Sequence, residues 1–267
     1  MNLKNLILSE LQRLICRKRT IFLAIITLFS FLFICFFNFS FRVGFYDPMT
    51  TTVLNRLNFP PFILRDFHLF LVLVFCPLLV VESFNKERRS GEYRMVMIRS
   101  YSKGQLYVAK VISLMMVMAV LTACLWLIGN LFSVLVFPSV NQTIFFTEQQ
   151  SYSVIGAMLF SLGFYFTEFL MLVSVCGIIS FVSLICPNAI TSYLGVVFVL
   201  IMVGFGYTPM EFLIISTKNI FDLLLQMSQP WRVILNLGLI LGIGLGGGRL
   251  TVYEGRLFII KEVAFVE

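Results

Sequence analysis

The hydrophobic positions of this chain form long unbroken segments, separated by shorter stretches that hold most of the charged residues. A helix needs about 20 mainly apolar residues to cross a hydrocarbon core of about 30 Å, and a transmembrane β-barrel would instead need short strands of alternating polarity. The pattern predicts an all-α integral membrane protein with a single domain over residues 1–267. Six spans are expected near residues 20–41, 67–81, 106–137, 152–185, 189–205 and 231–250.

The first 19 residues are amphipathic. On a helix, one face would carry Leu3, Ile7, Leu11, Leu14 and Ile15. Basic residues at 17–19 would then meet lipid headgroups, so this segment is predicted to be an interfacial helix on the cytoplasmic surface. Two roles stay open for this helix: it anchors the chain at the membrane surface only, or it also contacts a cytoplasmic partner. The span that follows is too long for the core of a cleaved signal peptide.

Two further segments are expected on the outer side. Residues 206–230 are partly apolar but carry three charged residues, which favours short re-entrant helices before the last span. Residues 42–66 include Pro48, Pro60 and Pro61 and are expected to form an outer loop.

Composition agrees with a membrane protein. Hydrophobic residues make up 59% of the chain, charged residues 12%, and the mean hydropathy is +0.96, values far from those of a soluble domain. The chain also has 30 Phe, which suit lipid-facing and interfacial positions.

The distribution of positive charge predicts the orientation. Of the 20 Lys and Arg, 15 fall on the side shared by both termini and by the connector between the second and third spans. Cytoplasmic loops carry the excess of these residues, so both termini and the connector are expected in the cytoplasm of a plasma-membrane protein, most simply a bacterial one. The pI near 9.2 then reflects topology, and no nucleic-acid partner is expected.

Residues suited to catalysis or to metal binding are scarce. The chain has no G-x-x-x-x-G-K-[ST] motif, so it is not expected to bind a nucleotide itself. The only histidine, His68, is expected at the membrane interface near the outer start of the second span. Six cysteines are scattered without a C-x-x-C motif and are interpreted as packing residues. No catalytic, cofactor-binding or metal-binding residue is predicted.

Two features within spans are candidates for helix contacts. Glu168 lies near the middle of the fourth span, where an ionised carboxylate costs about 2.5–3.5 kcal/mol on insertion scales. It is expected to bond a neighbouring helix or to line a substrate pathway. Gly238, Gly242 and Gly246 recur every four residues in the sixth span and favour close helix packing.

The connector at residues 82–105 is the most informative hydrophilic segment. Ser102 and Gln105 fit a capping box, which predicts a helix that begins near Lys103 and runs into the third span. Gly91 favours a break after a cytoplasmic extension of the second span. Between these points, residues 92–101 mix aliphatic and basic positions, as in a short amphipathic helix exposed to the cytoplasm.

The connector resembles that of the ABC-2 type permeases, the membrane subunits of a group of ABC transporters. Residues 87–91 (ERRSG) occupy the E-x-x-S-G positions of that family, and residues 95–97 its aliphatic run. Ser102 and Lys103 match its Ser-Arg pair, and Lys110 its later Lys, without gaps over 24 residues. Glu92 and the pair at 100–101 depart from the usual Thr and Pro-Val.

The resemblance implies a permease subunit of an ATP-driven exporter. Such a subunit pairs with a second permease copy or homologue and binds a separate ATP-binding subunit, which holds ATP and Mg and receives the cytoplasmic coupling helix. The residues expected to form this coupling surface are Glu87, Gly91, Arg94, Met97, Arg99 and Tyr101. Two alternatives stay open: an immunity, resistance or sensory protein that handles a membrane-active peptide without transport, and an integral-membrane lipid enzyme.

Overall fold

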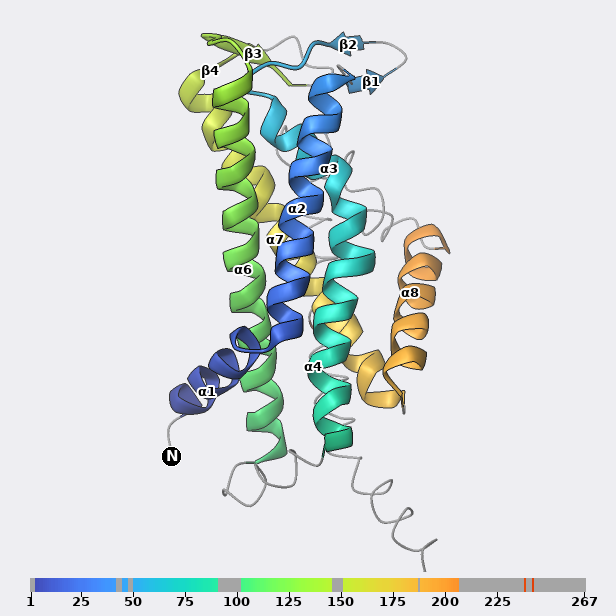
Figure 1. Cartoon of the computed structure of the whole chain (residues 1–267). Helices are drawn as coiled ribbons and strands as arrows, with labels where there is room; N and C mark the ends of the chain where they lie inside the picture. Colours follow the sequence, from blue (N-terminus) through green and yellow to red (C-terminus); the bar gives the residue numbers. More distant parts are fainter. Residues whose placement is uncertain are drawn as a thin grey trace, which may run out of the picture.

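The computed structural model describes residues 3–41, 45–47, 50–90, 102–145, 151–186 and 188–206, together with positions 238 and 242. The described chain is mainly helical, and five of its helical segments are long and apolar enough to cross a membrane (Figure 1). This confirms the class of a multi-pass helical membrane protein. The sixth predicted span, at residues 231–250, lies outside the described residues except for Gly238 and Gly242, which are helical.

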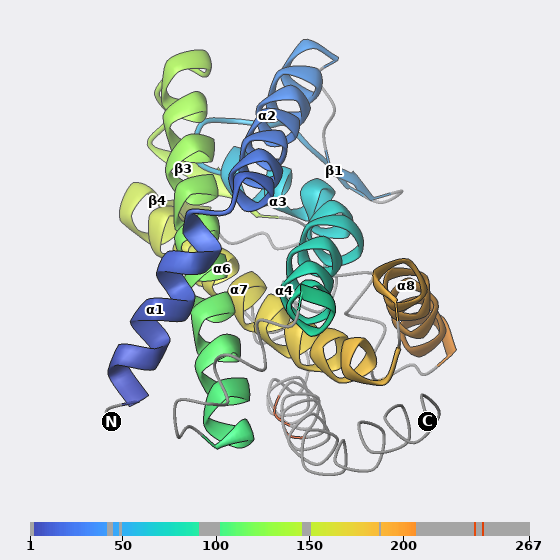
Figure 2. The ribbon, with the colours of Figure 1, turned by 60° about the horizontal axis from the view of Figure 1, so that its bottom comes forward.

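The first two helices follow directly on each other. Helix α1 (Leu3–Ile15) packs across the beginning of α6 (Lys103–Val136), and α2 (Lys18–Ser40) then runs along the bundle (Figure 2). The apolar face expected for α1 is only partly correct. Leu6, Glu10 and Leu14 are buried, whereas Leu3 and Ile15 are exposed, because α6 covers only one side of the helix.

The second span differs most from its prediction. It begins at Phe59 rather than near residue 67, and runs without interruption through α3 (Phe59–Phe70), the π-helix η1 (Leu71–Phe75) and α4 (Cys76–Ser90). Pro60 and Pro61, assigned above to an outer loop, lie in the first turn of α3. Proline is tolerated there because the first amide groups of a helix have no partner within it.

The remaining long helices are α6, α7 (Val154–Ile185) and α8 (Ala189–Gly206). At 1.5 Å per residue, the 34 residues of α6 and 32 of α7 reach about 50 Å, well beyond a hydrocarbon core of about 30 Å. Both therefore extend past the bilayer core.

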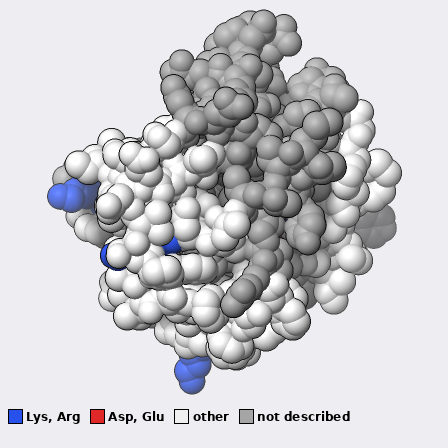
Figure 3. Space-filling view, turned by 90° about the horizontal axis from the view of Figure 1, so that it is seen from above, with Lys and Arg blue, Asp and Glu red and all other residues white. Residues whose placement is uncertain are grey.

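Two small antiparallel hairpins cover one end of the bundle (Figure 1). One joins β1 (Phe45–Asp47) to β2 (Thr50–Thr52), and the other joins β3 (Gln142–Ile144) to β4 (Ser151–Ser153). The all-α prediction did not include them. Seen from this end, the described surface is largely uncharged, with scattered Lys and Arg side chains (Figure 3).

Helix α7 and the segment from α3 to α4 form the centre of the bundle. In their most apolar windows, 61% and 67% of the residues are buried, against 17% in α2 and 22% in α8. Part of the Phe content fills this core: Phe31 and Phe67 meet edge to face at 5.2 Å between ring centroids, and Phe59 stacks on Phe132 at 5.5 Å. Other phenylalanines, such as Phe29 on α2, face outward as expected for lipid contact.

Candidate functional site

Most of the predicted coupling surface lies outside the described residues. All of its members from Gly91 to Tyr101 belong to that part of the chain. Glu87 lies within α4, although its side chain is not described. The coupling role of these residues therefore stays a prediction.

The glycines of the sixth span are described at two positions. At Gly238 and Gly242, no described atom other than those of the glycine, its chain neighbours and the nearby backbone of its own helix lies within 4 Å of the place that a Cβ would take. Gly246 is outside the described residues. Close packing of this glycine face on another helix stays a prediction.

The helix after the connector begins where the sequence predicts. Ser102 Oγ accepts from the backbone N–H of Gln105, and Gln105 Oε1 accepts from the backbone N–H of Ser102, both at 3.2 Å. The capping box and the start of α6 at Lys103 are thus confirmed. Two amide groups that the helix cannot satisfy itself gain partners in this way.

A buried lysine joins the two helices that flank the connector. Lys110 on α6 is fully buried, and its Nζ donates to the backbone carbonyl of Ser83 on α4 at 3.0 Å. The same ammonium lies 5.2 Å from the ring centroid of Phe84. Lys110 is also the last residue of the resemblance described above. It fixes α4 and α6 relative to each other seven residues from the end of α4 at Ser90 and seven from the start of α6 at Lys103.

A fully buried polar contact within the bundle joins residues 100 positions apart. His68 Nδ1 on α3 lies 2.7 Å from Oε1 and 2.8 Å from Oε2 of Glu168 on α7. The two side chains are 1% and 0% exposed. The contact is interhelical, and in the tautomer with a proton on Nδ1 the imidazole donates to the carboxylate, which lowers the cost of that group in the membrane.

The structure therefore corrects the interfacial position assigned to His68. Because α3 begins at Phe59, His68 lies more than two turns inside the helix and faces α7. The sequence held one signal for this pairing: an isolated carboxylate in an apolar span requires a polar partner, and His68 is the only histidine.

Other buried polar side chains surround this pair. Tyr165, one turn before Glu168 on α7, donates its hydroxyl to the backbone carbonyl of Pro60 at 3.1 Å. Cys76 on α4 lies 3.9 Å from Met118 Sδ and 3.8 Å from the carbonyl oxygen of Leu172. Within the described ranges, no group of three or more His, Cys, Asp and Glu side chains is arranged to hold a metal ion.

The π-helix near His68 has an identifiable cause. Pro77 has no amide hydrogen and cannot donate to the carbonyl four residues earlier, at Leu73. The helix widens here, with the Cys76 amide bonded to the carbonyl of Leu71 five residues before it. Tyr193 on α8 donates its hydroxyl to the Leu73 carbonyl at 3.1 Å. The carbonyl freed by proline thus becomes an attachment point for another helix.

Two more hydrogen bonds connect α7 and α8 to the half of the bundle near the connector. Tyr107 on α6 and Ser180 on α7 lie 2.9 Å apart between hydroxyl oxygens. Asn85 on α4 donates to Ser192 on α8 at 2.8 Å. Together with the Lys110 contact, these bonds join the connector-side ends of α4, α6, α7 and α8.

Comparison with protein-family models finds no match for this chain, and comparison with curated proteins finds none either.

Proposed function

We propose that this chain is the permease subunit of an ATP-driven exporter of the ABC-2 type, with its connector in the cytoplasm. The ATP-binding subunit that drives it is a separate protein, which holds ATP and Mg. A second permease, either a copy or a homologue, completes the transmembrane pathway. The sixth span at residues 231–250 and the location of both termini in the cytoplasm of a plasma-membrane protein belong to this proposal.

The observation that carries the proposal is the position of Lys110. A gapless spacing from Glu87 to Lys110 matches the coupling region of this family, and the lysine that ends it ties α4 to α6. A coupling helix needs a direct contact between the two helices that flank it, because a force on the coupling helix moves the spans only if both flanking helices are displaced together. The absence of a nucleotide-binding P-loop from the sequence is consistent with a partner ATPase.

The long helices would transmit a displacement from the connector into the bundle. From Ser90 to His68, the continuous helical segment covers about 33 Å at 1.5 Å per residue. Closure of the ATPase dimer would press on the connector and displace the ends of α4 and α6. Their shared contacts would carry that displacement toward the buried pair of His68 and Glu168.

Affinity purification of the tagged chain from its native membrane, followed by mass spectrometry, tests the proposal. We expect a P-loop ATPase to co-purify with it. The double variant Arg94→Glu, Arg99→Glu should lose this ATPase while inserting normally. The matched control, Lys4→Glu with Lys18→Glu, reverses two charges on the same side and should retain the ATPase. Failure to recover an ATPase, or full retention by the connector variant, would refute the proposal.

ATP hydrolysis by the purified complex separates export from peptide sequestration. In an exporter, cargo stimulates the ATPase activity of the reconstituted complex. In a sequestering immunity protein, a membrane-active peptide binds without changing that activity.

A further inference from the structure

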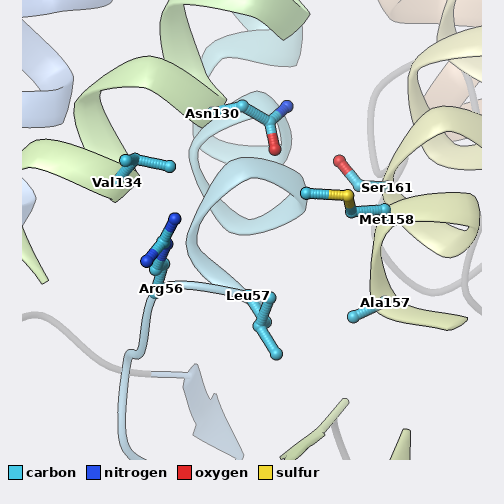
Figure 4. Close-up of a pocket in the computed structure, with 7 residues that line it drawn as sticks. All are labelled: Arg56, Leu57, Asn130, Val134, Ala157, Met158 and Ser161. Carbon is cyan, nitrogen blue, oxygen red and sulfur yellow. The ribbon is translucent and has the colours of Figure 1, made fainter. Parts of the chain in front are cut away.

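A small cavity lies between α6, α7 and the segment that leads into α3 (Figure 4). Its volume is about 20 Å³. The polar groups around it are the side chains of Arg56, Asn130 and Ser161, and the apolar walls include Leu57, Val134 and Met158. In the close-up, the oxygen of Asn130 and that of Ser161 point toward one another across the space, above the end of Met158.

The Asn130 amide group donates to the backbone carbonyl of Trp126 at 2.8 Å, but another polar group of the lining has no partner among the described residues. Ser161 is 1% exposed, and its hydroxyl has no hydrogen-bond partner. One turn from Asn130 on α6, the indole N–H of Trp126 is also buried without a partner. Burying such groups costs free energy unless they form hydrogen bonds. The site therefore favours a ligand atom that can accept or donate a hydrogen bond.

Arg56 adds a positive charge to this site. Among the described residues, no carboxylate forms an ion pair with it. Its backbone is held in place because the Ser133 hydroxyl on α6 donates to its carbonyl. A guanidinium in a partly apolar setting is suited to a phosphate, whose oxygens match its planar set of donors.

The cavity is positioned to be reached from the bilayer. Val134 and Met158, which line it from α6 and α7, are 44% and 49% exposed. Leu131 and Leu162 beside them are 60% and 52% exposed, so apolar surface flanks the opening on both helices. Asn130 and Ser161 lie about 10 Å along the axis from the nearer ends of their helices, close to the depth at which headgroups meet acyl chains.

We propose that this cavity binds the anionic head of a bilayer phospholipid that approaches laterally between α6 and α7. One headgroup hydroxyl enters the cavity, accepts from the Ser161 hydroxyl and donates to the side-chain oxygen of Asn130, while the phosphate lies against Arg56. The acyl chains remain outside on the exposed apolar residues of both helices. The small volume excludes a whole headgroup, so the cavity binds a single polar group of the lipid. Arg56 attracts the negative charge of the phosphate. This site does not depend on the proposed exporter function.

Trp126 provides a local reporter, because the chain has only two tryptophans and Trp231→Phe leaves this one alone. The single-Trp protein is reconstituted in vesicles of phosphatidylcholine that contain brominated phosphatidylglycerol or, in parallel, brominated phosphatidylcholine. Quenching by bromine is short-ranged and reports which lipid lies beside Trp126. We expect quenching to favour the anionic lipid about five-fold, as one basic residue near the surface would provide.

Two variants separate the cavity from general charge attraction. Arg56→Gln should bring the ratio to about one, and Ser161→Val, which fills the space and removes the hydroxyl, should lower it in the same direction. Arg65→Gln, a charge-matched control at the same end of the bundle, should retain the preference. A ratio near one in the parent protein would mean that the cavity holds only water. Full preference in Ser161→Val would mean that lipid meets Arg56 outside the cavity. Either result would overturn the proposal.

Discussion

Removing either partner of the contact between His68 and Glu168 tests whether this pair holds α3 against α7. His68→Leu and Glu168→Met each leave one polar side chain without its partner in a site that is at most 1% exposed. The combined variant replaces both with apolar residues of similar volume. The three variants and the parent chain form a double-mutant cycle.

The expected magnitudes follow from the burial of the pair. Breaking a buried charged pair on one side costs about 3–5 kcal/mol, whereas replacing both partners by apolar residues is often neutral or stabilising. Hydrogen bonds between uncharged side chains in membranes are weaker, about 0.6 kcal/mol on average and about 1.7 at most. With the contacts at 2.7 and 2.8 Å, we expect a coupling free energy of at least about 3 kcal/mol.

Unfolding of the purified protein in mixed micelles, titrated with a denaturing detergent and followed by circular dichroism, gives the four free energies. Thr167→Val is the matched control, because the Thr167 hydroxyl donates only to Gly163 on its own helix at 2.9 Å. That variant should couple to neither partner. A coupling between His68 and Glu168 below about 1.7 kcal/mol would show that the pair acts as an ordinary neutral hydrogen bond, and the reasoning above would be refuted.

Three further outcomes are expected. Lys110→Met removes the donor to the Ser83 carbonyl, so amide hydrogen exchange, measured by mass spectrometry, should become faster at the connector-side ends of α4 and α6. Unchanged exchange would show that Lys110 does not hold these two helix ends together. Tyr193→Phe should lower the free energy of unfolding by about 0.6–1.7 kcal/mol in the parent chain. In a Pro77→Ala background the loss should be smaller, because the new amide of residue 77 can bond the Leu73 carbonyl. Equal losses in the two backgrounds would show that Pro77 does not determine the contact between Tyr193 and Leu73. Ser102→Ala should cost about 1 kcal/mol by the same unfolding assay, and no loss would mean that the cap is dispensable.

The sequence predicts the long helices well because their signal is local. A span is recognised by the length of its apolar segment, and the start of α6 by two residues three positions apart, Ser102 and Gln105. The start of α3 has no such signal. Proline suits both a loop and the first turn of a helix, so Pro60 and Pro61 could not decide between the two.

The error at α3 explains the error at His68. With a span expected from residue 67, this histidine falls at the membrane surface; with the helix beginning at Phe59, it falls inside. Glu168 could be singled out because a carboxylate in an apolar span is costly. Its partner could not be deduced from spacing, because the two residues are 100 positions apart and only the packing of α3 on α7 brings them together.

Pro77 shows how one residue can determine a contact between distant helices. In a regular helix, the Leu73 carbonyl would accept from an amide four residues later, and the Tyr193 hydroxyl could bond it only as a second donor. Proline removes that amide donor, so a donor from another helix can satisfy the carbonyl in its place. The hydroxyl of Tyr193 supplies that donor and attaches α8 to the segment between His68 and the connector. Any displacement of α4 along its axis must therefore carry α8 with it or break this bond. The peripheral helix α8, only 22% buried in its apolar window, is for that reason mechanically linked to the central one.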